Sequence, residues 1–324
     1  MSRRMSGSAF GGKKGIYLVI ITAIISGLAN FFNKFGLQAL ARDSFQYTTL
    51  KNTVVALILS AIVLTPWLLP KLKKLSRREW VQLALVGLIG GSIPFLLFFK
   101  GLSSTSSVSA SFIHKTLFVW VAILAWPLLK EKISKLQFFA LGILLLGNVI
   151  FESFKGLSWG MAETLILMAT LLWAVETVIA KKVLHQLDST VLAWGRMFFG
   201  SIFLFGFLAM IGDTAGLLTL SLPQVGWLVL VSAFLTGYVL TWYAALKKLP
   251  ATVVACFLVI ASPITTFLNS AFVTHQLSSQ KIIGASIILV AVMLFAIVNK
   301  RFFPLSWRGA TPSLSKGSDE AMTR

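Results

Sequence analysis

Apolar runs of about 20 residues recur along this chain, and they constrain its fold more than any other feature. Each run is long enough to cross the hydrocarbon core of a bilayer as a helix. A soluble domain carries about 25% charged residues, whereas this chain of 324 residues is 12% charged and 57% hydrophobic. The pattern therefore predicts a polytopic membrane protein and excludes a soluble enzyme.

The runs are predicted to be helices, because a membrane-spanning strand needs only half their length and a helix satisfies its own backbone hydrogen bonds in lipid. We place ten spans at residues 15–33, 47–69, 80–99, 103–129, 136–154, 157–180, 190–211, 224–246, 251–273 and 281–298. A cytoplasmic tail at 1–14 and a disordered cytoplasmic tail at 300–324 complete the predicted organisation.

The net charge of +19 would suggest a nucleic-acid partner if the chain were soluble. In a membrane protein, Lys and Arg are retained on the cytoplasmic side. With the N-terminus inside, the inner segments hold 21 of these cations and the outer segments hold 5. The count predicts that both termini are cytoplasmic. The expected location is a bacterial inner membrane, with the lipid bilayer as a partner and no nucleic acid.

The chain also repeats itself at an offset of about 145 residues. Residues 26–34 match residues 173–181 in spacing, and residues 99–102 match residues 243–246. Because each copy holds five spans, an odd number, the second copy must enter the membrane from the opposite side. This predicts an all-α protein built from two inverted five-helix repeats, 15–154 and 157–298, an architecture that recurs in transporters.

Short fragments in both copies carry a family resemblance. They are Asn33-Lys34, Leu50-Lys51-Asn52, residues 98–102, residues 128–134, residues 172–181, Trp194-Gly195-Arg196, residues 242–246 and Ser262-Pro263. In this order and spacing, the chain resembles the drug/metabolite transporter superfamily, in its ten-helix EamA-type branch. Members usually carry a carboxylate after the ninth span, where this chain has His275 and Gln276. The resemblance implies a ten-helix membrane transporter.

Lys115 is predicted to contact the transported substrate, with His114 nearby. It lies about twelve residues into the fourth span, where an isolated charge costs roughly 2.5–3.5 kcal/mol. We expect no carboxylate at comparable depth in the third and fifth spans, and we expect Glu152 to be an ordinary interfacial residue. The alternative is a structural pair between Lys115 and a carboxylate on a neighbouring span.

Lys51 is the repeat counterpart of Arg196 and has no acidic partner at its depth. Asn30, Asn33 and Lys34 lie at a similar outer level. Together these side chains could line an entrance for an anion. The alternative is that Lys51 extends to the lipid headgroups.

Glu176 and Arg196 sit at matching depths in adjacent spans, so they are predicted to form a buried structural ion pair. Pro94 and Pro263 each remove a backbone hydrogen bond inside a span. Kinks at these two prolines would suit a bundle whose halves rock against each other.

The function predicted from these features is secondary active transport of a small polar metabolite, such as an amino acid or organic anion, by alternating access around a midplane site. A proton or a counter-substrate is the candidate coupling partner, and no cofactor is expected. The sequence has no phosphate-binding loop, no metal-ligand spacing and no constellation that predicts an enzyme. The alternative is a non-transporting membrane scaffold or lipid-binding protein that reuses the fold.

Overall fold

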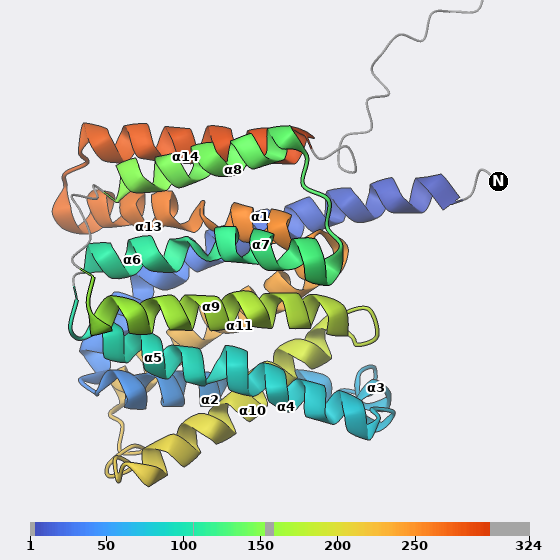
Figure 1. Ribbon diagram of the computed structural model, residues 1–324. Coiled ribbons are helices and arrows are strands. Elements are labelled where there is room, and N and C mark those ends of the chain that lie inside the picture. Colours follow the sequence, from blue (N-terminus) through green and yellow to red (C-terminus); the bar gives the residue numbers. More distant parts are fainter. Residues whose placement is uncertain (1–3, 106, 153–158, 299–324) are drawn as a thin grey trace, which may run out of the picture.

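Helices make up the regular secondary structure in this computed structural model, which describes residues 4–105, 107–152 and 159–298. In chain order they are α1 (Arg4–Leu40), α2 (Ser44–Val63), α3 (Leu69–Lys73), α4 (Arg77–Gly91), α5 (Ile93–Leu102), α6 (Ser107–Lys115), α7 (Leu117–Leu129), α8 (Lys135–Phe151), α9 (Met161–Val183), α10 (Ser189–Met210), α11 (Leu222–Lys248), α12 (Ala251–Leu258), α13 (Ala261–Asn269), the π-helical turn η1 (Ser270–Thr274) and α14 (Ser279–Val298). They lie side by side in one bundle (Figure 1). The predicted tail 300–324 lies outside the described residues.

Within the described residues, eight helical stretches are long and apolar enough to cross a membrane. Three of them run through helix breaks: Arg77–Leu102, Ser109–Leu129 and Ala251–Thr274. The predicted spans 47–69 and 136–154 fall on α2 and α8, which do not reach this measure. The helix α8 has only 17 residues, and α2 carries polar residues along its first half. The chain is an integral membrane protein, with eight of its ten predicted spans found as apolar helices.

Helix starts recur at a constant spacing, which ties the sequence repeat to the structure. Asp43 and Asp188 cap α2 and α10 through their side chains and are 145 residues apart (188 − 43 = 145). Ser76 and Ser221, at the same separation, precede α4 and α11. In each, a Glu or Gln three residues later accepts the backbone N–H of the serine.

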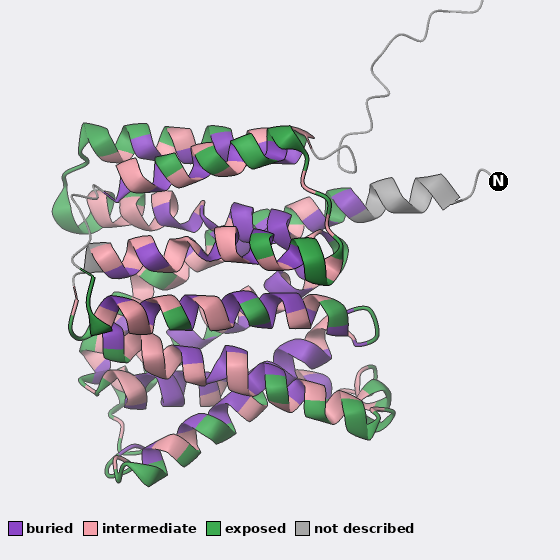
Figure 2. Ribbon diagram, in the orientation of Figure 1, coloured by how far each residue is buried: buried purple, intermediate pink, exposed green. Residues whose placement is uncertain are grey.

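The buried hydrophobic side chains form one large cluster and two smaller ones between the helices. In the bundle α1 packs on α11, α8 on α14, α5 on α9, and both α2 and α4 on α10. Figure 2 shows exposed residues on the outward faces of α8 and α14. Many of the exposed residues in the bundle are large and apolar, such as Phe138, Phe139 and Met293. Such faces suit contact with lipid tails rather than water.

Both predicted proline kinks fall beside helix breaks. Between α4 and α5, Ser92 leaves the helical conformation at φ −136° and ψ −73°, two residues before Pro94. A second break, at residues 259–260, separates α12 from α13, and Pro263 follows it inside α13. The prolines therefore sit in the first turns of new helices, where the missing N–H costs little. A gating role for them stays a prediction.

Candidate functional site

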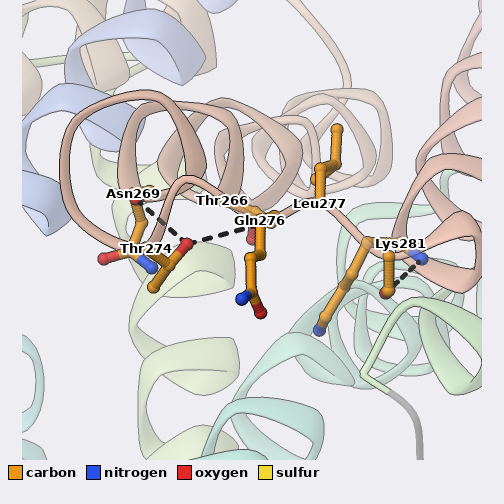
Figure 3. A pocket seen from close by; sticks show the side chains of 7 residues that line it. Thr266, Asn269, Thr274, Gln276, Leu277 and Lys281 are labelled. Carbon is orange, nitrogen blue, oxygen red and sulfur yellow. Dashed lines mark hydrogen bonds between the residues drawn. The ribbon is translucent and has the colours of Figure 1, made fainter.

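Two adjoining cavities open where α1, η1 and the start of α14 meet, which we call the cavity end. The larger, of about 660 Å³, is lined by Thr266, Asn269, Thr274, Gln276, Leu277, Ser278 and Lys281 (Figure 3). The smaller, of about 210 Å³, is lined by Asn30, Phe31, Lys34, Thr265, Thr266 and Asn269. Because Thr266 and Asn269 line both, the two spaces form one polar region beside α13.

The lining combines cations with neutral hydrogen-bonding groups. Lys34 comes from the first sequence copy and Lys281 from the second, and no carboxylate lines either cavity in the described part of the chain. Hydroxyl and amide side chains of α13 and η1 supply further donors and acceptors. This chemistry suits a small polar molecule with an anionic group, because hydrogen bonds from ammonium groups to anions are stronger than neutral ones.

Of the residues predicted for substrate binding, Asn30 and Lys34 line the cavity region. The side of the cavities formed by α13 and α14 was not predicted from the sequence. Thr266 and Asn269 are three residues apart within an apolar run, which places them on one helical face. That polar stripe is the signal that could have revealed them. Lys281, one of the five outer cations in the charge count, lies in the first turn of α14.

Lys115 forms an ion pair with Glu152, so the expectation that Lys115 has no neighbouring carboxylate is wrong. Glu152, which we expected to be an ordinary interfacial residue, is buried within the protein. Its Oε1 accepts a hydrogen bond from Ser111 Oγ at 2.9 Å, and its Oε2 lies 3.8 Å from Lys281 Nζ. The depth estimate failed because α6 begins at Ser107, which makes Lys115 its ninth and last residue. The pair therefore lies directly behind the cavity lysine, and substrate contact by Lys115 itself stays a prediction.

Lys51 is buried and does not extend to the headgroups. Its Nζ lies 3.3 Å from Asn33 Oδ1 and 4.9 Å from the centre of the Tyr47 ring. The Tyr47 hydroxyl donates to the same Asn33 oxygen at 2.7 Å. Neither Lys51 nor Asn33 lines the cavities. Asn33 of α1 therefore contacts both Lys51 and Tyr47 of α2, whereas Asn30 and Lys34 line the smaller cavity.

Glu176 and Arg196 are both buried, but the ion pairs within the described residues do not include a direct contact between them. Glu176 Oε1 instead accepts the Tyr243 hydroxyl at 2.5 Å. Arg196 Nη2 donates to the Gly90 carbonyl at 3.0 Å, and its guanidinium carbon lies 5.9 Å from the Tyr243 ring centre. The predicted direct pair fails because Tyr243, on α11, occupies the carboxylate. Matched depth along two helices could not reveal this third helix.

His114 lies in an aromatic cluster rather than in the cavities. Its ring centre is 4.8 Å from that of Trp173 and 5.3 Å from that of Phe98. The Nδ1 atom of His114 is buried and has no hydrogen-bond partner in the described part of the chain. Its location favours a packing contact between α5, α6 and α9.

The opposite end of the bundle, where α7, α9 and α11 finish, is closed by side-chain links; we call it the cation-rich end. The links join Glu131 to the N–H of Ala251, Lys181 to the carbonyls of Leu246 and Leu249, Lys247 to the carbonyl of Leu187, and Lys71 to Asp188. Burial alone would raise the pKa of Asp188, but the bond from Lys71 and the N–H of Thr190 hold that pKa below its usual range. The bundle thus has polar cavities at one end and side-chain links across the other.

Comparison with known proteins then identifies the family. A model of the EamA-like transporter family matches residues 13–152 and, a second time, residues 160–297. The chain belongs to the EamA-like transporter family. Two successive matches within one EamA-like chain agree with the repeat seen in its helix caps.

Relatives of this EamA-like protein carry transporter names. A protein of Archaeoglobus fulgidus, named an uncharacterized transporter, is 27% identical over 248 residues, covering 74% of this chain and 82% of its own. An uncharacterized transporter of Clostridium kluyveri is 25% identical over 302 residues, covering 89% and 95% of the two chains. A solved crystal structure, described only as that of a protein, matches with a TM-score of 0.72 at 14% identity, over 92% of this chain and 99% of that one. This likeness shows the fold.

Proposed function

We propose that this EamA-like protein is a secondary active transporter of a small polar metabolite with an anionic group, such as an amino acid or an organic acid. In the proposed topology α2 and α8 cross the membrane together with the eight apolar helices. The ten spans then form two inverted five-helix copies, with the cation-rich end and both termini in the cytoplasm of a bacterial cell.

The observation that carries this proposal is the cavity region shared by the two copies. Lys34 and Asn30 reach it from the first copy, and Asn269 and Lys281 reach it from the second. In inverted-repeat transporters, substrate sites lie between the copies, which move against each other to expose the site to one side at a time. A cavity end that is open and a cation-rich end that is tied shut correspond to one half of such a cycle.

The anionic preference follows from the charges around the cavities. Lys34 and Lys281 line the cavities, and the half-buried Lys115 lies behind Lys281. The carboxylate recorded beside these lysines is Glu152, which contacts Lys115 and Lys281. The local excess of positive charge attracts an anion and disfavours a cation. With no phosphate-binding loop in the sequence to harness ATP, a proton or a counter-substrate is the proposed coupling partner.

Uptake by purified protein in sealed lipid vesicles tests the proposal. Labelled amino acids and organic acids would be chosen by a thermal-shift screen, because a ligand that binds the folded state raises its stability. Lys281→Met should reduce the apparent affinity by roughly 10- to 100-fold, since a hydrogen bond to a charged group contributes about 1.5–3 kcal/mol. Lys100→Met is the matched control, because Lys100 is exposed and lies outside both cavities.

Uptake that is unaffected by Lys281→Met would contradict the proposed site. If folded protein moved none of the compounds but bound lipid or a membrane partner, the alternative of a scaffold or lipid-binding protein would be favoured instead.

A further inference from the structure

Two links at the cation-rich end hold α11 and α12 in place. Lys181 Nζ donates to the carbonyl of Leu246 at 2.6 Å, close to the end of α11. The Glu131 carboxylate accepts the backbone N–H groups of Ala251 and Thr252, at 2.6 and 3.2 Å, and also the Thr252 hydroxyl. Glu131 therefore caps the first turn of α12 from the neighbouring α7–α8 connection.

Repeat counterparts of both linking residues lie at the cavity end. Lys130 and His275 each end a helical segment in the left-handed conformation, at φ 54° and 51°. Glu131 follows Lys130, and Gln276 follows His275, so Gln276 is the counterpart of Glu131. The helix α6 opens the matching span of the first copy, as α12 does in the second. The counterpart of the Glu131 link is therefore a bond from Gln276 to the first turn of α6.

The second link has a counterpart as well. Residues 26–34 match residues 173–181, which pairs Lys34 with Lys181, and residues 99–102 match residues 243–246, which pairs Leu102 with Leu246. A bond from Lys34 Nζ to the carbonyl of Leu102, at the end of α5, would reproduce the observed bond from Lys181.

Neither counterpart bond is formed in this structure. Lys34 lines the smaller cavity and Gln276 the larger, and both residues are exposed. In the described part of the chain, the Lys34 ammonium and the Gln276 side-chain amide make no hydrogen bond or ion pair. Figure 3 shows the Gln276 side chain beside Thr266 and Lys281, within the cavity lining. The residues equivalent to those that tie the cation-rich end shut are thus free at the open end.

We infer that Lys34 and Gln276 are the residues that close the cavity end when the cation-rich end opens. Lys34 then donates to the carbonyls at the end of α5, and the Gln276 side-chain carbonyl accepts N–H groups from the first turn of α6. This inference rests on the proposed alternating access. Because Gln276 is neutral where Glu131 is charged, the closure at the cavity end is the weaker one. The difference accounts for a resting state that is open at the cavity end.

Distances between paired spin labels test the inference without any substrate. One pair, Gln38→Cys with Ser104→Cys, reports on the cavity end. The other, His185→Cys with Lys248→Cys, occupies the counterpart positions at the cation-rich end, and all four native residues are exposed. A Cys256→Ala background removes the single native thiol, which is buried. Double electron–electron resonance in lipid vesicles then measures how often each end is open.

The decisive substitution is Gln276→Glu, which gives the cavity end the same residue type that Glu131 provides at the cation-rich end. It should raise the ratio of closed to open cavity ends by about fivefold, the ratio that a difference of about 1 kcal/mol between charged and neutral hydrogen bonds produces. The distance across the cation-rich end should lengthen in the same fraction of molecules. Gln280→Glu makes the same chemical change at an exposed residue outside both cavities and should leave both distances unchanged.

Lys34→Met gives the opposite readout and should remove the closed population at the cavity end, with Lys100→Met as its control. Unchanged distances in both Gln276→Glu and Lys34→Met would overturn the inference, as would an equal shift in Gln280→Glu. If the distances respond as expected while vesicles take up no compound, the closing residues stand and the proposed transport fails. If vesicles take up a compound but the distances do not respond, the proposed transport stands and the inference about the closing residues fails.

Discussion

At the residue scale, two buried carboxylates in this protein, Glu152 and Glu176, are held by side chains from other helices. Lys115 on α6 meets Glu152 after α8, and Lys281 on α14 approaches the same carboxylate. Glu176 on α9 meets Tyr243 on α11. Charges buried in a membrane bundle need such partners, because an unpaired one costs several kcal/mol.

The Lys115–Glu152 pair should show strong coupling in a double-mutant cycle. Lys115→Met and Glu152→Gln should each lower thermal stability in detergent, and the double variant should lose less than the sum of the two. We expect a coupling energy of about 0.5–3 kcal/mol, reduced by the partial exposure of the lysine. Additive losses in thermal melts would mean that the two residues do not stabilise each other.

Tyr243→Phe tests the partner that replaces the expected ion pair. The variant keeps the ring and removes only the hydroxyl that donates to Glu176, which leaves a buried oxygen unsatisfied. The free energy of unfolding should fall by about 1–3 kcal/mol. Tyr17→Phe, at an exposed ring on α1, provides the control and should melt like wild type. Equal melting of the two variants would show that the hydroxyl contributes nothing to stability.

At the element scale, the crossing of α4 and α10 depends on two glycines in backbone contact. A Cβ at Gly200 would lie 2.9 Å from Gly91 Cα, and a Cβ at Gly91 would lie 2.5 Å from the Arg196 carbonyl oxygen. Such small residues let membrane helices approach closely. This crossing also holds Arg196 against the Gly90 carbonyl.

Gly200→Ala should therefore destabilise the protein by about 1–3 kcal/mol through overpacking, although alanine is the better helix former. Gly206→Ala lies on the same helix, where a Cβ meets no atom within 4 Å. This control should be neutral or slightly stabilising in the same thermal melts. A Gly200→Ala variant as stable as the control would show that the backbone crossing is looser than described.

At the scale of the whole molecule, the two ends differ in charge and in closure. The cation-rich end carries lysines that bond to helix-end carbonyls or to Asp188, whereas the cavity end exposes Lys34 beside an open space. The positive-inside rule favours the cytoplasm for the first of these ends, which is the orientation that we propose. The open cavity would then face outward.

Labelling of intact cells checks this orientation. A membrane-impermeant maleimide added outside should modify Lys34→Cys, and it should modify Lys182→Cys only after the cells are permeabilised, because both native residues are exposed at opposite ends. Wild-type protein supplies the background, since its single thiol, Cys256, is buried. Labelling of Lys182→Cys in sealed cells would reverse the proposed topology.

The sequence by itself determined the membrane class, the family and the repeat. These properties depend on run length, charge counts and spacing along the chain, all of which are local or additive. It also singled out Asn30 and Lys34, which line the cavities. Polar side chains at the end of an apolar run indicate a wet environment even without a fold.

Only the tertiary structure decided which residues meet. Lys115 meets Glu152 across 37 residues of chain, and Tyr243 meets Glu176 across 67. Lys34 of α1 and Lys281 of α14 line adjoining cavities although they lie near opposite ends of the chain. Sequence gives the depth of a residue along its own helix, but not the rotation of that helix or the identity of its neighbours. Helix breaks at Ser92 and before Pro263 change even the depth of a residue from the value counted along the sequence. For this reason the membrane protein was predictable from its sequence, whereas the arrangement of its charges was not.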